Sequence, residues 1–410
     1  MNRVVVTGAG VVSPLGDNAD VFFQALIAGR SGIRALGQTW GSALRSPYAG
    51  IVVDEPDVKV MKAKRIGFDR VAVFALSAAR QAAAASGLSF DGEPGESAGV
   101  FWGTGMGGAV ALEAAYRELL EKKATRIRPS TVVSVMNNSA TGQIAIDLGI
   151  RGPSNTYSTA CSSSAIAIGE AFRAIRHGHV RAALVGGGDA LLTYGVLKAW
   201  ESIGTLARID PAQPQTSIRP FAADRSGFLL AEGAAALMLE NEADARARGA
   251  VILAEIVGYG NSTDAGHITH PDAQGQARAI RLALAEAGIA PRQVGHINAH
   301  GTGTRVGDLA ETTAIKAVFG AHAGLIPISA TKALHGHLMG ATGALEFIAA
   351  IQSMRTGIAP PTAHLWQPDP ECDLDYVPLH ARSMAPVEYV MANSFGFGGS
   401  NAVLVARRHG

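Results

Sequence analysis

A cysteine stands among small side chains in TACSSS (Thr159–Ser164), directly before an apolar run that predicts a helix over residues 165–175. A thiol at a helix start lies near free backbone N–H groups and the positive end of the helix dipole. Both favour the thiolate, which is the form that attacks carbonyl carbons. Cys161 is therefore a candidate nucleophile for acyl transfer, with an inert buried cysteine as the ordinary alternative.

Three further segments embed polar side chains among small ones. His300 lies in NAHGTGT, residues 332–337 contain a lysine and two histidines, and Phe397 lies in the glycine loop SFGFGGS (Ser394–Ser400). Imidazoles can donate hydrogen bonds or move protons, and N–H groups of a glycine loop can stabilise an oxyanion. Together with a cysteine nucleophile, these groups indicate chemistry through a covalent thioester.

Histidine pairs at His267/His270 and His335/His337 suggest metal ligation. Neither pair supplies a third or fourth ligand at a fixed spacing, and Cys161 has no partner at such a spacing. We therefore expect no metal, and no other cofactor.

The elements that position these residues alternate between strands and helices, which is typical of a layered α/β fold. Residues 3–6 predict a buried strand that ends in a glycine turn at residues 7–10. In each half of the chain a reactive residue type stands at a strand end or a helix start, the usual place for sites in such folds. A charged helical stretch over residues 241–249 predicts a connection between two domains, residues 1–250 and 251–410.

Glycine-rich segments imitate other functions. The segment from Gly8 to Pro14 resembles a dinucleotide-binding start, but the proline interrupts the helix that would hold a pyrophosphate. Gly103–Gly108 lies between a predicted strand and a helix, yet no ribose-binding acid follows. We expect this loop to approach a ligand or backbone closely instead. Gly95–Gly99 fits a nucleophile elbow, but its strand follows the serine rather than preceding it.

Composition excludes several classes of protein. Of 410 residues, 48% are apolar and 17% charged, which indicates a large globular fold rather than disorder. The net charge of +1 gives no global signal for nucleic acid or membrane binding. Two cysteines form no disulfide framework, and with no signal-peptide pattern or bilayer-length apolar stretch we expect a cytoplasmic protein.

The chain resembles the β-ketoacyl-[acyl-carrier-protein] synthases, most closely the elongating type II enzymes of fatty-acid synthesis. The matching segments occur in the family's order and approximate spacing: VVVTGAGVVSPLG, TACSSS, NAHGTGT, TKALHGHLMGATGALE and NSFGFGGSNA. The resemblance implies a thiolase-like fold, with two similar halves packed as five α/β layers and dimers formed through sheet edges. It implies condensation of a cysteine-bound acyl group with malonyl-acyl carrier protein, which gives 3-oxoacyl-acyl carrier protein and CO2.

The resemblance also assigns roles. Cys161 would take the acyl chain, and His300 and His337 would bind the malonyl thioester carbonyl and assist decarboxylation. Lys332 would organise the two histidines, and the histidine five residues after it is the catalytic one, so His335 is not.

Further residues have expected roles around this centre. Phe397 resembles a gating phenylalanine, and its N–H would form an oxyanion hole with that of Cys161. The supporting acids would be Asp308, Glu311 and Glu346, and the residues that contact the phosphopantetheine arm would be Thr302, Thr304 and Thr269.

The acyl carrier protein is the expected partner, and because it is acidic a local basic patch would dock it. We expect a homodimer, with a heterodimer that includes a chain-length partner as the alternative. The candidate docking residues are Lys62, Lys64, Arg65, Arg126 and Arg128.

The residues expected around the acyl pocket are bulkier than is usual for long-chain elongating enzymes. This favours a shorter or differently routed pocket, or a specialised polyketide or polyene ketosynthase that works with a chain-length partner. The residues are Met106, Leu191, Val196 and Trp200.

Related readings fit less well. A thiolase needs a second cysteine in the C-terminal glycine loop, which has none, and Cys372 is expected in a surface loop. A starter-type synthase would carry asparagine in place of His337. A non-catalytic chain-length factor would lack the nucleophile, and a nicotinamide oxidoreductase rests only on the glycine segments.

Overall fold

Ten strands form one continuous sheet in the computed structural model, which describes residues 1–38, 40–58 and 68–410. The strand order is β10-β9-β13-β14-β8-β1-β7-β6-β4-β5. The bounds are β1 Val4–Val12, β4 Ala98–Gly103, β5 Ser154–Tyr157, β6 Ala182–Asp189, β7 Gly233–Asn241, β8 Ala254–Thr263, β9 Val294–Asn298, β10 Ile328–Ser329, β13 Tyr389–Gly396 and β14 Ser400–Arg407. Two short ribbons pair β2 (Ile33–Ala35) with β3 (Tyr48–Gly50), and β11 (Ile358–Ala359) with β12 (Arg382–Ser383).

Helices connect and cover these strands. No helix in the described ranges is both long and apolar enough to cross a bilayer. Their bounds are α1 Ala19–Ile27, α2 Arg70–Ser86, α3 Glu93–Glu96, α4 Ala109–Leu120, α5 Thr131–Val135, α6 Ser139–Leu148, α7 Ser163–Arg176, α8 Tyr194–Ile203, α9 Glu242–Ala247, α10 Ala273–Ala287, α11 Arg305–Phe319, α12 Lys332–His335 and α13 Thr342–Thr356.

The sheet consists of the same arrangement built twice. From the edge inward, β5-β4-β6-β7-β1 pair as parallel, parallel, antiparallel and antiparallel neighbours. The order β10-β9-β13-β14-β8 repeats that series. The two sets join where Val4–Val6 of β1 pairs with Ala254–Ile256 of β8. The topology therefore contains the two similar halves that the family resemblance implied.

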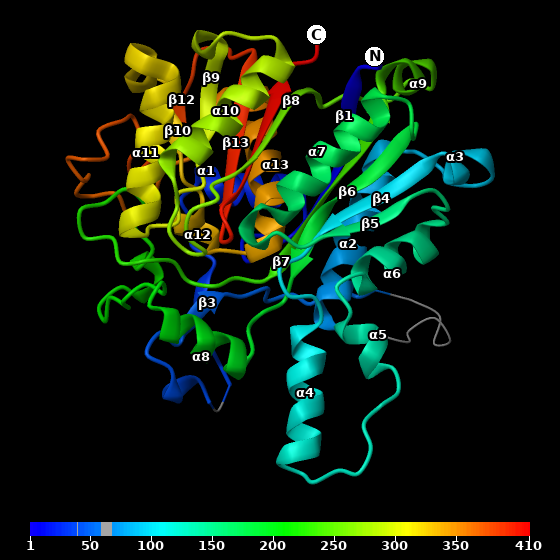
Figure 1. Ribbon diagram of the computed structural model, residues 1–410, viewed down its shortest axis with the longest axis vertical. Helices are drawn as coiled ribbons and strands as arrows, with labels where there is room; N and C mark the ends of the chain where they lie inside the picture. Colours follow the sequence, from blue (N-terminus) through cyan, green and yellow to red (C-terminus); the bar gives the residue numbers. More distant parts are fainter. Residues whose placement is uncertain (39, 59–67) are drawn as a thin grey trace.

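Helices α7 and α13 lie between the two strand sets, and other helices cover the outer faces (Figure 1). Helix α7 contacts β4 and β6 of the first set as well as β8 and β14 of the second. Helices α2 and α6 cover the first set, and α10 and α11 cover the second. This is the expected order of five layers, α/β/α/β/α.

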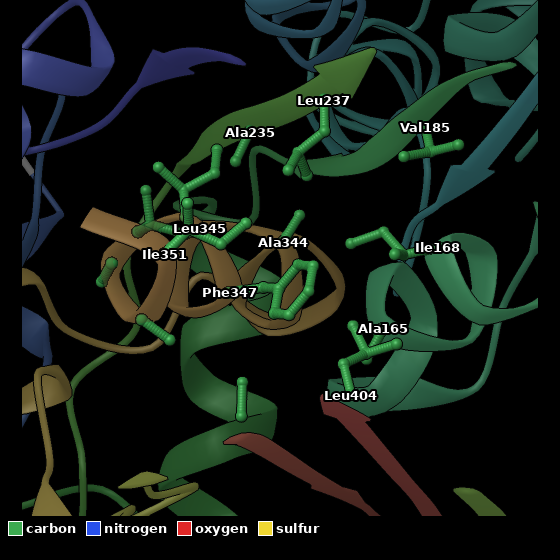
Figure 2. Close-up of a cluster of buried hydrophobic side chains, with 14 of the residues drawn as sticks. Ala165, Ile168, Val185, Ala235, Leu237, Ala344, Leu345, Phe347, Ile351 and Leu404 are labelled. Atoms are coloured by element: carbon green, nitrogen blue, oxygen red, sulfur yellow. The ribbon is translucent and has the colours of Figure 1, made fainter. Parts of the chain in front are cut away.

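The central layer forms the main hydrophobic core. Figure 2 shows Ile168 of α7 and Phe347 of α13 among side chains from β6, β7 and β14. Small residues such as Ala165 and Ala344 let the two helices approach closely. This dense packing fixes the N-termini of both helices, and the candidate reactive residues stand there.

The predicted glycine turn at residues 7–10 is wrong, because these residues continue β1. A Cβ at Gly8 would lie 2.1 Å from the Ala82 carbonyl oxygen of α2, and one at Gly10 would lie 2.0 Å from that of Ala78. The glycines therefore allow α2 to lie directly on the strand, which a local pattern does not distinguish from a turn.

Candidate active site

Cys161 lies in a short 3₁₀ turn, Ala160–Ser162, immediately before α7. Ala160 has a left-handed φ of +52°, a strained backbone for a residue with a Cβ. The Ser163 hydroxyl holds the turn, because it accepts from Thr159 N at 2.9 Å and donates to Ala160 O at 2.6 Å. The thiol is thereby placed at a defined point at the helix start.

The Cys161 thiol is buried, and burial raises its pKa to about 12. The positive charge of Lys332 and the N–H of Phe397 act in the opposite direction but are outweighed. The expectation that the helix start favours a thiolate is therefore wrong for the resting site. The reason is desolvation by residues distant in sequence, such as Leu36, Phe228 and Met339 of the same apolar cluster, which the local sequence does not reveal.

His300 and His337 join Cys161 at one point. The sulfur and one nitrogen from each imidazole lie within 4.8 Å of one another, and His337 Nε2 is 3.0 Å from Cys161 Sγ. The imidazole rings are 5.7 Å apart at an angle of 80°. All three residues line a cavity of about 160 Å³. The fold thus brings together the three residues predicted to react.

The tautomer of His337 follows from its neighbours. Met339 N donates to His337 Nδ1 at 3.3 Å, and Thr342 Oγ1 lies 3.0 Å from the same nitrogen. A nitrogen that accepts from a backbone N–H carries no proton, so the proton of the neutral ring is on Nε2. His337 therefore presents an N–H group to Cys161.

Lys332 sets the same tautomer in His300. Its ammonium group lies 3.3 Å from His300 Nδ1, donates to the His300 carbonyl and pairs with Glu346 at 2.8 Å. Burial lowers the pKa of both His300 and His337 well below the usual value, and the charge of Lys332 lowers it further. Both imidazoles are therefore neutral N–H donors at pH 7.

Cys161, His300 and His337 also form a group of three possible metal ligands, which their spacing in the sequence did not indicate. Three ligand atoms do come within reach of a common ion, because the fold joins distant segments. However, Lys332 and Met339 N both donate to the Nδ1 atoms, which turns N–H groups rather than lone pairs toward the cavity. This donor set fits an oxyanion better than a cation.

His335 faces away from this centre. Its ring lies 3.0 Å from Thr331 Oγ1 and 2.6 Å from the Gly336 carbonyl. Of these two histidines, His337 is therefore the one that lies against Cys161.

The predicted supporting acids hold the loop that follows β9. Glu311 accepts from His300 N at 2.9 Å and Gly301 N at 2.8 Å. It also accepts from Asn393 at 3.0 Å, a residue that the sequence reasoning did not assign. Burial raises the pKa of Asp308 to about 7. That carboxylate accepts from Gly303 N at 3.0 Å, so both acids position His300 without touching the cavity centre.

A row of aromatic rings runs from Phe397 to the imidazole of His337. Phe397 stacks on Trp200 at 5.7 Å, Trp200 meets Phe228 edge-on at 5.5 Å, and Phe228 meets His337 edge-on at 5.0 Å. Phe228 was not predicted, because its segment carries only a turn signal. The row forms one wall of the cavity.

The other predicted binding residues fall in two places. Thr269, Thr302 and Thr304 line the cavity that reaches Cys161. Met106 and Val196 instead line a separate hollow of about 390 Å³ between α4 and the start of α8.

Leu191 is buried in the apolar cluster that contains Cys161. Cys372 is also buried, so its expected place on the surface is wrong. Arg126 and Arg128 lie between α4 and α5. The remaining candidate docking residues, Lys62, Lys64 and Arg65, lie outside the described residues.

Comparison with known proteins agrees with this geometry. Residues 1–245 match the family described as Beta-ketoacyl synthase, N-terminal domain, and residues 253–366 match Beta-ketoacyl synthase, C-terminal domain. The chain belongs to the β-ketoacyl synthase family. It is 39% identical to 3-oxoacyl-[acyl-carrier-protein] synthase 2 of Staphylococcus aureus (strain N315), over 99% of this chain and 98% of that protein. It is 42% identical to Nodulation protein E of Rhizobium meliloti (strain 1021), over 99% of each.

Solved structures of β-ketoacyl synthase relatives share the fold along the whole chain. The ishigamide ketosynthase/chain length factor matches with a TM-score of 0.90 and 35% identity, covering 100% of both chains. A type II polyketide synthase acyl-carrier protein in complex with its ketosynthase bound to the hexaketide matches with a TM-score of 0.92 and 32% identity, again over 100% of both chains. These matches confirm the thiolase-like fold.

Proposed function

We propose that this β-ketoacyl synthase condenses an acyl group held on Cys161 with malonyl-acyl carrier protein, in fatty-acid synthesis. The products are 3-oxoacyl-acyl carrier protein and CO2. The observation that carries the proposal is the convergence of one thiol and two neutral imidazole N–H donors within 4.8 Å at the same cavity.

In the first step Cys161 Sγ attacks the thioester carbonyl of the acyl carrier protein. The C–S bond to the carrier breaks, and the thiol proton leaves on the carrier's sulfur. The backbone N–H groups of Cys161 and Phe397 stabilise the oxyanion, as both already point toward the sulfur and lower the pKa of its thiol. Cys161 therefore does not need to be ionised before the attack, because its proton leaves with the carrier's sulfur.

In the second step the malonyl thioester oxygen accepts from the Nε2–H groups of His300 and His337. The bond to the carboxylate breaks, CO2 leaves, and the electron pair forms an enolate on the thioester. The enolate carbon then attacks the acyl carbonyl, and Cys161 leaves as the thiolate. Neutral donors suit this step, because the enolate oxygen gains charge while no proton is removed from carbon.

The remaining predicted residues serve this sequence. Lys332 and Glu346 keep His300 in the donor tautomer, and Phe397 opens and closes the route to Cys161. The phosphopantetheine arm passes Thr269, Thr302 and Thr304. We further assign residues 1–250 and 251–410 to two domains, the first with the nucleophile and the second with the histidines.

A second candidate is a specialised polyketide or polyene ketosynthase paired with a chain-length partner. Its support is the likeness to the ishigamide ketosynthase/chain length factor, together with Trp200 in the cavity wall. In this case the protein would form a heterodimer rather than the homodimer proposed for fatty-acid synthesis.

The test incubates the protein with acyl-carrier protein substrates of different chain lengths and malonyl-carrier protein. Condensation product should form and should disappear in Cys161→Ala. The matched control is Cys372→Ala, which removes the other buried cysteine and should retain activity. Product that persists in Cys161→Ala would refute the proposal. Condensation that requires an added chain-length partner would favour the second candidate.

A further inference from the structure

Asp189 is a fully buried carboxylate that the proposed chemistry does not use. It ends β6, and its exposed fraction is 0%. In the described part of the chain it forms no ion pair. A buried charge without a cation must be stabilised by hydrogen-bond donors. The question is what those donors hold in place.

The first group of donors belongs to the glycine loop that follows β4. Asp189 accepts from Thr104 Oγ1 at 3.0 Å, from Gly105 N at 2.8 Å and from Met106 N at 3.3 Å. Thr104 Oγ1 in turn accepts from Gly107 N at 3.2 Å. The segment that imitates a nucleotide-binding loop is therefore wrapped around a carboxylate of the protein itself.

The remaining donor comes from the second half of the chain. Gly340 N donates to Asp189 Oδ2 at 2.7 Å. Gly340 lies in the 3₁₀ turn Met339–Ala341, and a Cβ on it would lie 2.5 Å from Gly105 N. The carboxylate thus joins the glycine loop to the turn that precedes α13.

That turn sets the tautomer of His337. Met339 has a left-handed φ of +49°, a strained backbone that surrounding contacts must maintain. Its N–H donates to His337 Nδ1, and its neighbour Gly340 is the residue that Asp189 holds. The path from the carboxylate to the imidazole therefore takes two consecutive peptide units.

We propose that Asp189 is a positioning residue. Its carboxylate fixes Gly340, so that Met339 presents its N–H to His337 Nδ1 and keeps Nε2–H directed at the reacting atoms. The inference rests on the proposed function for the role of His337 in decarboxylation. It predicts a larger effect on decarboxylation than on acyl loading, which distinguishes it from a general effect on the site.

The charge of Asp189 supports a role toward His337 rather than in activation of Cys161. Burial raises the pKa of Asp189 to about 6, and the surrounding donors oppose that shift, so the group is ionised at neutral pH. The same negative charge raises the pKa of the Cys161 thiol. Asp189 therefore does not activate the nucleophile, and loss of its charge should affect acyl loading much less than decarboxylation.

The test compares two half-reactions in Asp189→Asn. The amide has the same shape as the carboxylate, but it turns an N–H toward Gly105 N or Gly340 N. Because a charged acceptor is lost, we expect malonyl decarboxylation to be about 30-fold slower. Acyl loading of Cys161, followed by intact mass, should not slow by more than about threefold. A matched control is Asp69→Asn, since Asp69 is another buried carboxylate that accepts from backbone N–H groups, those of Val71 and Ala111. This control should change stability without separating the half-reactions.

A second readout does not depend on turnover. In protein with ¹⁵N-labelled histidine, Asp189→Asn should shift the Nδ1 resonance of His337, whereas Asp69→Asn should not. If Asp189→Asn does not fold, Gly340→Ala tests the same contact, because its Cβ would displace Gly105 N. Equal loss of both half-reactions, or no loss in either, would overturn the proposal. Absence of acyl loading in the unaltered protein would instead refute the proposed function.

Discussion

The turn before α7 and the turn before α13 occupy the same place in the two halves of the molecule. Each is a short 3₁₀ turn that leads into a helix of the central layer, and each begins at a left-handed residue, Ala160 or Met339. The next residue is Cys161 in the first turn and Gly340 in the second. The two turns therefore have the same backbone conformation, but the first carries a thiol at its second position and the second carries no side chain there.

The strands that face these turns end in different residues. Asp189 ends β6 and binds the N–H of Gly340, whereas Gly396 ends the equivalent strand, β13. A Cβ on Gly396 would lie 3.3 Å from Cys161 N. A carboxylate thus occupies the N–H of one turn, and the absence of a side chain leaves the N–H of the other available for an oxyanion. The comparison teaches that one turn geometry serves positioning in one half and catalysis in the other.

The strongest test of the comparison is Gly396→Ala. The added methyl group would lie 2.7 Å from the Thr159 carbonyl and displace the turn that carries Cys161. We expect acyl loading to fall about 100-fold or more, the usual cost of an oxyanion-hole donor. Intact-mass kinetics of loading would measure it. Unchanged loading would show that Cys161 N is not the donor, and the control is Gly142→Ala in α6, where a Cβ meets open space and the backbone has no positive φ.

The next test removes the charge beside the histidines. Lys332→Met would leave Glu346 buried without its cation, which we expect to cost about 3–5 kcal/mol of stability. His300 would also lose the donor that fixes its tautomer, so decarboxylation should fall more than acyl loading. Thermal unfolding and the two half-reaction rates measure these effects. The double variant Lys332→Met/Glu346→Gln should recover stability but not decarboxylation; recovery of both would contradict the role of Lys332.

The pH dependence of thiol alkylation tests the resting state of the first turn. Burial raises the pKa of Cys161 to about 12, so the thiolate fraction should rise about tenfold per pH unit through the neutral and mildly alkaline range. Iodoacetamide modification followed by mass spectrometry should show that slope between pH 7 and 9. A slope that begins to level near about pH 8.5 would indicate an ordinary thiol, and a rate already level by about pH 7 would indicate an activated thiolate.

The smallest expected effect concerns the aromatic wall. Trp200→Leu removes the ring that stacks on Phe397, and we expect acyl-chain selectivity to change by about tenfold with little change in decarboxylation. Trp40→Leu is the control, because Trp40 packs on Tyr194 outside the cavity lining. Competition between short and long acyl-carrier substrates measures the ratio. An unchanged ratio would remove Trp200 from the specificity determinants.

Local motifs singled out residues that meet in the fold, because Cys161, His300 and Lys332 each lie in a short segment that places polar side chains among small ones. The partners of these residues could not be predicted in the same way. The pairing of Asp189 with Gly340 depends on how a strand end of one half meets a turn of the other.

The errors have the same physical origin. The pKa of Cys161 is governed by burial under residues distant in sequence, and Gly8 serves helix packing that only the fold reveals. The alternation of strands and helices predicted a layered fold. The repeated pattern of parallel and antiparallel pairs could be seen only from the strand order in the structure.

The most direct test of the central claim is a single turnover of isolated acyl-Cys161 protein mixed with malonyl-acyl carrier protein. We expect the acyl mass to leave Cys161 in step with the appearance of CO2 and 3-oxoacyl-acyl carrier protein, in equal amounts. Release of CO2 and formation of product while the acyl group remains on Cys161 would contradict it.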